Sequence, residues 1–221
     1  MKIQGKHFVI TGGGSGLGAA TAEYLVEKGA SVTLVDMNVE AGEQQAQALG
    51  EKAEFVKLDV TDEQAAEQFF QDVVAKHGCL HGLVNCAGIG PSAKVIGKES
   101  VHDLAMFSKT LQINVTGTFN MLRFAAEAMS KNTVEADDED RGVIVNTASV
   151  AAFDGQIGQA AYSASKGAVV AMTLPIAREL ARHAIRIMVI VPGIMETPML
   201  KGLLQNVQDA LGQMVPYPSR L

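Results

Sequence analysis

A tyrosine and a lysine stand four residues apart in the segment YSASK, at Tyr162 and Lys166. In a helix this spacing places both side chains on one face. A free phenol has a pKa of about 10 and is a poor base at neutral pH, whereas a nearby ammonium group favours its ionised form. The pair therefore predicts a general acid/base that exchanges a proton with an alcohol or a ketone.

The glycine-rich segment TGGGSGLG at residues 11–18 follows an apolar run and opens a helical pattern. Glycines let the backbone approach a pyrophosphate, and a helix N-terminus offers free N–H groups. Asp36 ends the next apolar run, where a carboxylate can accept both ribose hydroxyls of NAD and repel the extra phosphate of NADP. These residues predict NAD as the cofactor. The alternatives are a glycine turn without a ligand and a helix-capping role for Asp36.

Asp59 and Val60 follow the third apolar run. We expect them at the crevice where the order of the strands reverses, because a ligand lying across the strand ends would meet them there. Asp59 can bond an adenine amino group or cap the next helix, and the sequence leaves both open.

Apolar runs and helical patterns alternate along the chain. This alternation predicts an α/β fold, a single-domain Rossmann doubly wound parallel sheet over residues 1–221 with helices on both faces. The acidic run from Glu135 to Asp140 predicts a solvated surface loop. The expected strands are 7–11, 31–35, 53–58, 82–84, 143–147 and 185–191. The expected helices are 16–28, 39–49, 62–76, 160–182 and 100–130, the last in two pieces around Asn114 and Gly117.

Composition narrows the class of protein. The net charge of −6 without a dense basic run argues against nucleic acid or an anionic membrane surface as a partner. No apolar run approaches the roughly 18 residues of a membrane helix. Two cysteines indicate a reducing compartment, and a strand pattern that begins at His7 leaves no room for a signal or transit peptide. We therefore expect a cytoplasmic protein.

In their order along the chain, these segments resemble the short-chain dehydrogenase/reductase family. Within that family, the stretch from Arg141 to Leu180 and the segment PYPSRL at 216–221 resemble members that oxidise 3-hydroxyacyl-CoA and also act on hydroxysteroids. NCAG has a cysteine where the wider family usually has a second asparagine. The matching segments are TGGGSGLG, Asp36, Asp59-Val60, NCAG at 85–88, Asn114, Ser149, YSASK and PGIMETPM at 192–199.

The resemblance implies a role for each candidate catalytic residue. Tyr162 would take the alcohol proton while the carbinol carbon gives a hydride to the nicotinamide, and Ser149 would bond the substrate oxygen. Lys166 would hold the nicotinamide ribose and lower the pKa of Tyr162. Asn114, at a helix break, would hold a water that passes protons toward Lys166, and Gln156 would contact the substrate.

The resemblance also implies an NAD-dependent enzyme of fatty-acid β-oxidation type, a homotetramer or homodimer, without a metal. A loop at about 194–212 would close over an apolar substrate. The sequence stops at Leu221, before the last strand of the family, and a protein without that strand would have an exposed sheet edge. The implied cofactor-binding residues are Gly12, Ser15, Gly16, Leu17, Gly18, Asp36, Asp59, Val60, Asn85, Cys86, Ala87, Gly88, Tyr162, Lys166, Pro192, Gly193 and Thr197.

Other functions remain open at this stage. Within the family these are a hydroxysteroid dehydrogenase and a 3-oxoacyl reductase, and outside it a non-catalytic NAD-binding protein. Ser163 and Lys166 form the S-x-x-K signature of a serine hydrolase, but its S-D-N and K-T-G partners are absent from the sequence. A zinc site is the last alternative, and one tetrahedron would require the fourth strand to fold back. Its ligands would be His77, Cys79, His81 and Cys86.

Overall fold

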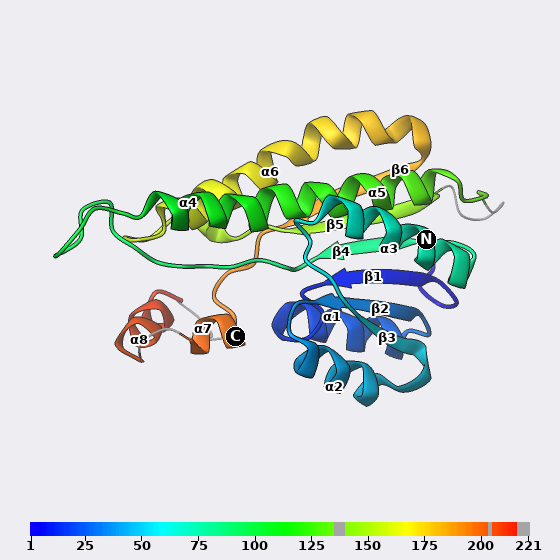
Figure 1. Cartoon of the computed structure of the whole chain (residues 1–221), viewed down its shortest axis with the longest axis horizontal. Helices are drawn as coiled ribbons and strands as arrows, with labels where there is room; N and C mark the ends of the chain where they lie inside the picture. The colour runs from blue at the N-terminus through cyan, green and yellow to red at the C-terminus, as the bar shows by residue number, and fades with distance from the viewer. Residues whose placement is uncertain (135–139, 203–204, 216–221) are drawn as a thin grey trace.

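Six parallel strands form one sheet in the part of the chain that this computed structural model describes, residues 1–134, 140–202 and 205–215 (Figure 1). Their order is β3-β2-β1-β4-β5-β6, so the order reverses between β1 and β4. This arrangement confirms the predicted doubly wound Rossmann fold. The strands are β1 (His7–Thr11), β2 (Ser31–Asp36), β3 (Ala53–Lys57), β4 (Gly82–Asn85), β5 (Gly142–Thr147) and β6 (Ile185–Ile190).

Helices cover both faces of the sheet, α1 and α2 on one and α3, α5 and α6 on the other (Figure 1). The strand arrows point toward the side of the molecule that carries α4, α7 and α8. The helices are α1 (Gly16–Glu27), α2 (Val39–Leu49), α3 (Glu63–His77), α4 (Leu104–Leu111), α5 (Thr118–Ser130), α6 (Ala160–Leu180), α7 (Pro198–Lys201) and α8 (Gln205–Gln213).

Strand β1 shows why the sheet needs helices on both faces. All five of its residues are buried, and successive side chains in a strand point to opposite faces. Val9 packs into the core beneath α3 and α5, whereas Phe8 and Ile10 pack into the core beneath α1. A strand that is buried on both faces has a continuous run of apolar residues in its sequence, and this pattern predicted β1.

The long helical region before β5 differs from the prediction. Instead of a break around Asn114, a π-helical turn at Gln112–Gly117 joins α4 to α5 without interruption. A π turn inserts an extra residue into a continuing helix and often marks a functional position. A Cβ on Gly117 would lie 2.5 Å from Cγ2 of Val60, so glycine lets this turn pack against the segment after β3.

The expected position of Asp59 was also wrong. Strand β3 lies at the edge of the sheet, whereas the strand order reverses between β1 and β4. The segment after β3 therefore starts two strands away from the reversal point. The prediction failed because the alternation of strands and helices does not determine the positions of the first three strands in the sheet.

Three predicted segments lie wholly or partly outside the described residues. They are residues 135–139 of the acidic run, residues 203–204 of the expected substrate loop, and PYPSRL at 216–221. Among the residues that are described, no helix is long and apolar enough to cross a bilayer.

Candidate active site

Tyr162 and Lys166 lie near the beginning of α6, and their side chains share one helix face as the spacing predicts. The Lys166 ammonium nitrogen lies 5.7 Å from the centroid of the Tyr162 ring. Lys166 is only 6% exposed and donates a hydrogen bond of 2.7 Å to the carbonyl oxygen of Thr147 at the end of β5. Burial lowers the pKa of Lys166 to about 8, and the neighbouring Cys86 opposes that shift.

The ionisation of Tyr162 differs from the expectation. Burial raises the pKa of Tyr162, and a hydrogen bond with Ser149 opposes the rise. Lys166 is not among the causes of this shift, and its ammonium group donates to the Thr147 carbonyl. Ser149 precedes a short 3₁₀ turn, where its hydroxyl also accepts a hydrogen bond of 3.2 Å from the backbone N–H of Ala151.

Asn114 lies in the π turn and is 1% exposed. Its side-chain oxygen accepts from the N–H of Ile89 at 2.8 Å. Its side-chain nitrogen donates to the carbonyl of Ile89 at 2.8 Å and to the hydroxyl of Ser165 at 2.9 Å. Asn114 therefore fastens the segment after β4 to α6, one residue before Lys166. The sequence analysis did not predict Ser165 as a site residue, and only its position inside YSASK could have indicated it.

The glycine turn after β1 depends on close backbone approach. Gly12 has a φ of 66°, and a Cβ there would lie 2.8 Å from the backbone nitrogen of Ala87. A Cβ on Gly18 would lie 2.1 Å from the carbonyl oxygen of Gly12. Any side chain at these positions would push the turn away from β4 and from the start of α1. The turn thus keeps the exposed backbone surface that a pyrophosphate requires.

Asp36 ends β2 beside this turn. One carboxylate oxygen accepts from the N–H of Gly14 at 3.1 Å and the other from the N–H of Asn38 at 3.0 Å. The N-cap of α2 is Asn38, which accepts from the N–H of Ala41. The capping alternative for Asp36 was therefore wrong, and its carboxylate lies against the glycine turn.

Asp59 also does not cap a helix. Its carboxylate accepts from the N–H and the hydroxyl of Thr61, at 2.9 Å and 2.8 Å. Asp62 is the N-cap of α3. Val60 is buried, and its carbonyl oxygen accepts a hydrogen bond from the Asn120 side chain on α5. The segment after β3 is thereby held next to the π-helical region.

A buried polar row crosses the carboxyl ends of the central strands. The hydroxyl oxygen of Thr11 accepts from the N–H groups of Cys86 and Ala87, at 3.2 Å and 3.1 Å. The Asn85 side chain donates to Asn146 on β5 at 2.9 Å. Thr11 and Asn146 were missed as site residues, although a polar residue inside an otherwise apolar strand is a signal that could have found them.

The other predicted residues surround the same edge. A Cβ on Gly88 would lie 3.0 Å from the Asn114 side chain and 3.7 Å from the Lys166 nitrogen. The sulfur of Cys86 lies 3.5 Å from the Thr147 hydroxyl, and burial raises the pKa of this thiol. Ser15 precedes α1, which contains Gly16 and Leu17, whereas Pro192 and Gly193 follow β6.

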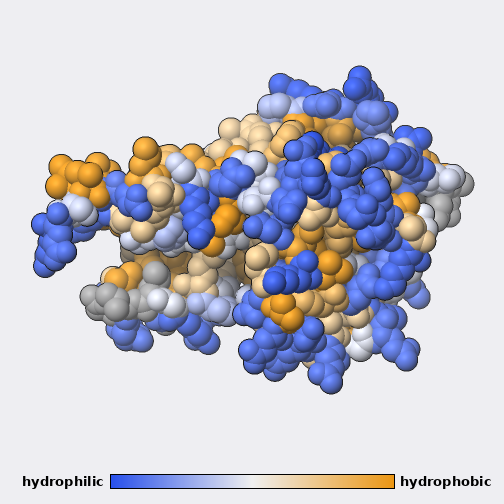
Figure 2. Space-filling model, viewed as in Figure 1, coloured by the Kyte–Doolittle hydropathy of each residue, from blue (hydrophilic) through white to orange (hydrophobic). Residues whose placement is uncertain are grey.

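The segment after β6 returns to the site. A Cβ on Gly16 would lie 3.4 Å from the Thr197 side chain, so Thr197 adjoins the glycine turn. A Cβ on Gly90 would lie 3.4 Å from the Met199 sulfur and 3.6 Å from the Tyr162 ring. In Figure 2 the surface is hollowed beside the segment that carries α7 and α8. Met199 on α7 and Tyr162 therefore both adjoin Gly90, and the substrate-covering role of this segment stays a prediction.

Gln156 lies on the stretch between Ser149 and α6. Its side-chain nitrogen donates to the carbonyl of Asp154 at 3.4 Å, and its backbone N–H donates to the Gln159 side chain at 2.9 Å. The side chain is partly exposed and makes a long hydrogen bond, so a substrate group can replace this contact at small cost.

The structure does not assemble the two other candidate sites. Ser163 is a buried hydroxyl with no hydrogen-bond partner among the described residues, and Lys166 donates to Thr147 instead. The S-x-x-K pair of a hydrolase is therefore not formed. Cys79 and His81 precede β4 whereas Cys86 follows it, so four residues of extended chain, roughly 13 Å, separate them. The tetrahedron with His77 cannot close.

Comparisons with known proteins agree with the fold. The family profile described as short chain dehydrogenase matches residues 6–208. A Drosophila melanogaster protein named 3-hydroxyacyl-CoA dehydrogenase type-2 is 50% identical over 215 residues, which are 96% of this chain and 84% of that protein. The Homo sapiens protein of the same name is 48% identical, over 99% of this chain and 84% of its own length. The crystal structure of 3-hydroxyacyl-CoA dehydrogenase type-2 from Mycobacterium avium superposes with a TM-score of 0.90 at 32% identity and covers 100% of this chain and 86% of that chain.

Proposed function

The chain belongs to the short-chain dehydrogenase family, and from this premise we propose that it oxidises 3-hydroxyacyl-CoA reversibly to 3-ketoacyl-CoA with NAD. The predictions of the family and of the oxidoreductase class are confirmed, and membership implies a nicotinamide cofactor. Two relatives, at 50% and 48% identity, are named 3-hydroxyacyl-CoA dehydrogenase type-2 and support this choice of substrate. The observation that carries the proposal is that Tyr162, Lys166 and the glycine turn lie at the same edge of the sheet.

The residues at that edge fit a dinucleotide. Gly12 and Gly18 keep open a turn that any Cβ would distort, and backbone N–H groups at a helix N-terminus bind phosphate. When bound, the nicotinamide supplies the hydride acceptor. Asp36 lies against the turn through Gly14 and would accept the ribose hydroxyls, which favours NAD because a 2′-phosphate would meet a carboxylate.

Tyr162 and Ser149 then divide the work on the substrate oxygen. The Ser149 hydroxyl holds the oxygen in place, and the Tyr162 oxygen takes the proton as the carbinol carbon gives up its hydride. The C–H and O–H bonds of the alcohol break, and the C=O bond of the ketone forms. Burial raises the pKa of Tyr162, so its phenol keeps its proton at neutral pH. It gives this proton to the substrate oxygen in the reverse reduction, whereas the oxidation requires that the phenol first lose it.

Lys166 connects this step to the rest of the site. Its ammonium group lies between the Tyr162 ring and the Thr147 carbonyl, and it would hold the nicotinamide ribose from there. Asn114 lies next to this group, across Gly88. Both amide atoms of Asn114 are occupied by Ile89 and Ser165, so its side chain acts by fixing the position of α6. The water that Asn114 would hold to pass protons toward Lys166 stays a prediction.

A substrate panel tests this proposal. Purified protein is mixed with short 3-hydroxyacyl-CoA thioesters, a hydroxysteroid, or a 3-oxoacyl thioester with NADH, and the NADH absorbance is followed. The proposal expects the highest kcat/KM for the 3-hydroxyacyl-CoA thioesters with NAD. A higher kcat/KM for the hydroxysteroid would contradict the proposed substrate and identify the protein as a hydroxysteroid dehydrogenase. NAD binding without turnover of any substrate would favour the non-catalytic alternative.

The same proposal includes a cytoplasmic homotetramer or homodimer that acts in fatty-acid breakdown. Apolar side chains near the tip of the segment between β4 and α4 support self-association, since Val95, Ile96 and Val101 are 66%, 78% and 72% exposed. Figure 2 shows apolar surface at this projecting end. Light scattering on the purified protein checks the prediction, and a monomer at micromolar concentration would contradict it.

A further inference from the structure

A second polar cluster lies at the opposite end of the sheet, at the amino ends of the strands. His7 begins β1, Glu54 lies on β3 and His77 ends α3. Their candidate ligand atoms all lie within 4.8 Å of one another. His7 is 4% exposed, and the other two side chains are partly buried, at 26% for Glu54 and 22% for His77. No residue of the proposed active site takes part in this cluster.

The hydrogen bonds of the cluster fix which atoms carry protons. A carboxylate only accepts, so Thr33 donates to an oxygen of Glu54 at 2.7 Å, and His77 donates to the same oxygen from Nε2 at 2.8 Å. Having donated its own proton, the Thr33 hydroxyl accepts from Nε2 of His7 at 3.0 Å. Nδ1 of His7 then accepts from the Ser31 hydroxyl at 2.8 Å. The His77 N–H therefore points to the Glu54 carboxylate directly, and the His7 N–H is linked to the same carboxylate through the Thr33 hydroxyl.

We propose that this cluster is a zinc site, in which Nε2 of His7, Nε2 of His77 and the carboxylate of Glu54 bind the ion and a water is the fourth ligand. Two histidines and a glutamate form an established zinc donor set, and three protein ligands leave one open position. The ring protons move from Nε2 to Nδ1 when the ion binds. Nδ1–H of His7 then donates to Ser31, which is the second hydrogen bond that a zinc-binding histidine needs.

The site needs a small rearrangement to close. Nitrogen ligands of a tetrahedral zinc lie about 3.3 Å apart, given zinc–nitrogen bonds of about 2.05 Å. The His7 and His77 rings are stacked, with centroids 3.7 Å apart and planes inclined by 13°. Two parallel rings cannot both direct lone pairs at one ion, so the His77 ring must rotate. His77 can do so because it ends α3, is partly exposed and precedes Gly78, which adopts a left-handed conformation.

The ionisation of the cluster is compatible with zinc. Burial lowers the pKa of His7 to about 4, so its imidazole is neutral at pH 7, as a ligand must be. Burial alone would raise the pKa of Glu54, but hydrogen bonds from Lys76, Thr33 and His77 lower it to about 2. The carboxylate is therefore charged, and its second oxygen pairs with the Lys76 ammonium group.

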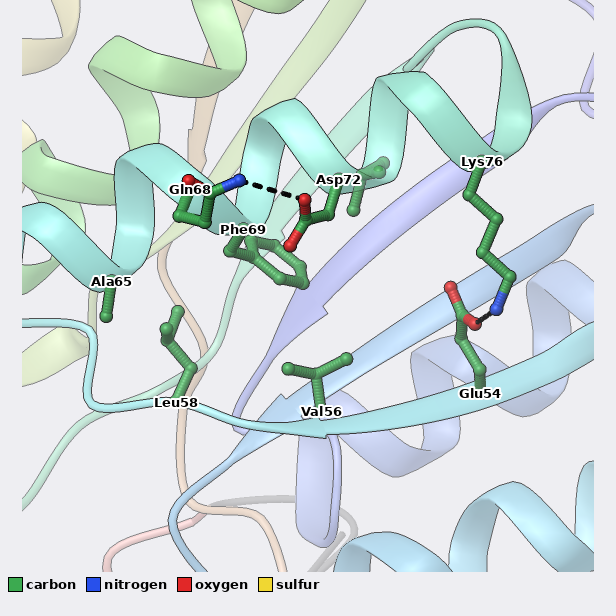
Figure 3. A pocket seen from close by; sticks show the side chains of 9 residues that line it. Glu54, Val56, Leu58, Ala65, Gln68, Phe69, Asp72 and Lys76 are labelled. Atoms are coloured by element: carbon green, nitrogen blue, oxygen red, sulfur yellow. Dashed lines mark hydrogen bonds and ion pairs between the residues drawn. The ribbon is translucent and has the colours of Figure 1, made fainter.

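Figure 3 shows the groove that Glu54 lines, and we expect an ion to reach the cluster through it. A groove of about 380 Å³ runs between β3 and α3, and the paired side chains of Glu54 and Lys76 line one end of it. Val56 and Phe69 line its apolar part. The Lys76 ammonium group already pairs with Glu54, so an incoming zinc ion competes with it for the carboxylate. We therefore expect zinc to bind through the Glu54 oxygen that faces His77, while Lys76 keeps the other oxygen.

Zinc at this position would join β1, β3 and α3, which are separate in sequence. Ligands that bind only the folded state raise its stability. Because the cluster lies at the other end of the strands from Tyr162, we expect zinc to raise the melting temperature without a change in kcat.

The experiment measures zinc affinity in the metal-free whole chain, by competition with a chromophoric chelator at pH 7.5, together with the melting temperature. The wild type is expected to bind one equivalent more than the His77→Gln variant. In Ser31→Ala, which keeps all three ligands, affinity should fall about 10- to 100-fold. The matched control is His102→Gln, which removes a histidine outside the cluster and should leave affinity unchanged.

Two results would overturn the zinc site. One is a wild type that binds no zinc and does not gain thermal stability at millimolar free zinc. The other is a His77→Gln variant with the wild-type affinity and the same gain in melting temperature. The turnover of His77→Gln is measured alongside, and a loss of kcat there would disprove the separation from the active site.

Discussion

The two ends of the same parallel sheet carry polar residues in different ways. At the carboxyl ends, the site depends on backbone that only glycine permits, as at Gly12 and Gly18, and on buried side chains such as Asn114, whose amide oxygen and nitrogen both have protein partners. At the amino ends, the contacts are between side chains alone: His77 bonds Glu54 directly, and His7 is linked to it through Thr33. The first end is rigid and suited to positioning reacting atoms, whereas the second can adapt to an ion.

The sharpest test of this difference is Tyr162→Phe. The change removes the only proton-exchanging atom that the mechanism assigns to the substrate oxygen, so kcat should fall about 10²- to 10⁴-fold. The ring and its packing remain, so cofactor binding should persist. The protein has no tryptophan, so the fluorescence of NADH reports binding with little interference.

Tyr24→Phe is the matched control for that variant. Tyr24 lies on α1, is 54% exposed, and has Lys28 over its ring, so it presents a tyrosine and a lysine four residues apart without the buried setting. Its loss should leave kcat unchanged. If Tyr162→Phe kept the wild-type rate, proton transfer would have to be assigned to another group.

A second test concerns the buried charge of Lys166. Burial lowers its pKa from 10.5 to about 8. Between these two values the unfolded chain holds the proton and the folded chain does not, so the free energy of unfolding rises with pH. Relative to Lys166→Met, the cofactor-free wild type should gain about 2 kcal/mol between pH 8 and pH 9.5.

Urea denaturation of both proteins at each pH measures this gain. Lys52→Met serves as the control, because Lys52 is exposed before β3 and its removal should give no pH-dependent difference. Parallel curves for the wild type and Lys166→Met from pH 8 to pH 9.5 would show that the lysine titrates as if it were in water. The lysine would then not be desolvated in the way its burial requires.

A third and smaller effect is expected for Asp36→Ala. Loss of a hydrogen bond to a charged group costs about 1.5 kcal/mol, which corresponds to about tenfold in affinity for NAD. The repulsion between the carboxylate and the 2′-phosphate of NADP disappears as well. The ratio of kcat/KM for NAD to that for NADP should therefore fall by more than about tenfold. Asp72→Ala removes a carboxylate from α3, where it bonds Gln68, and should keep the ratio. An unchanged ratio in Asp36→Ala would show that this residue does not contact the ribose.

The active-site end was predictable from the sequence to a greater degree than the other end. Tyr162, Lys166 and the glycine turn belong to short segments whose spacing carries a geometric meaning. The π turn around Asn114 was not predictable, because a helix and a helix with one inserted residue have nearly the same pattern of apolar side chains. Capping, the alternative to cofactor binding for Asp36 and one of two open roles for Asp59, was wrong because Asn38 and Asp62 are the N-caps of α2 and α3.

The amino-end cluster shows a different limit. His77 was considered as a metal ligand, but with neighbours chosen by their closeness in sequence. Its partners His7 and Glu54 are 70 and 23 residues away along the chain, and they meet it only because β1 and β3 flank β2 and α3 packs across them. Such contacts depend on strand order and register, which no local pattern contains.

The smallest effect is expected for Lys76→Gln, and it separates the two ends most directly. The Lys76–Glu54 ion pair has a lysine that is 64% exposed, and such pairs contribute less than about 1 kcal/mol to folding. The free energy of unfolding without metal should therefore hardly change. Zinc affinity should rise severalfold, since the cation that competes for Glu54 is gone, and kcat should stay at the wild-type value. A chelator titration and an NADH assay on the same sample measure both quantities, and a fall in zinc affinity would mean that Lys76 orients Glu54 for the ion instead of competing with it.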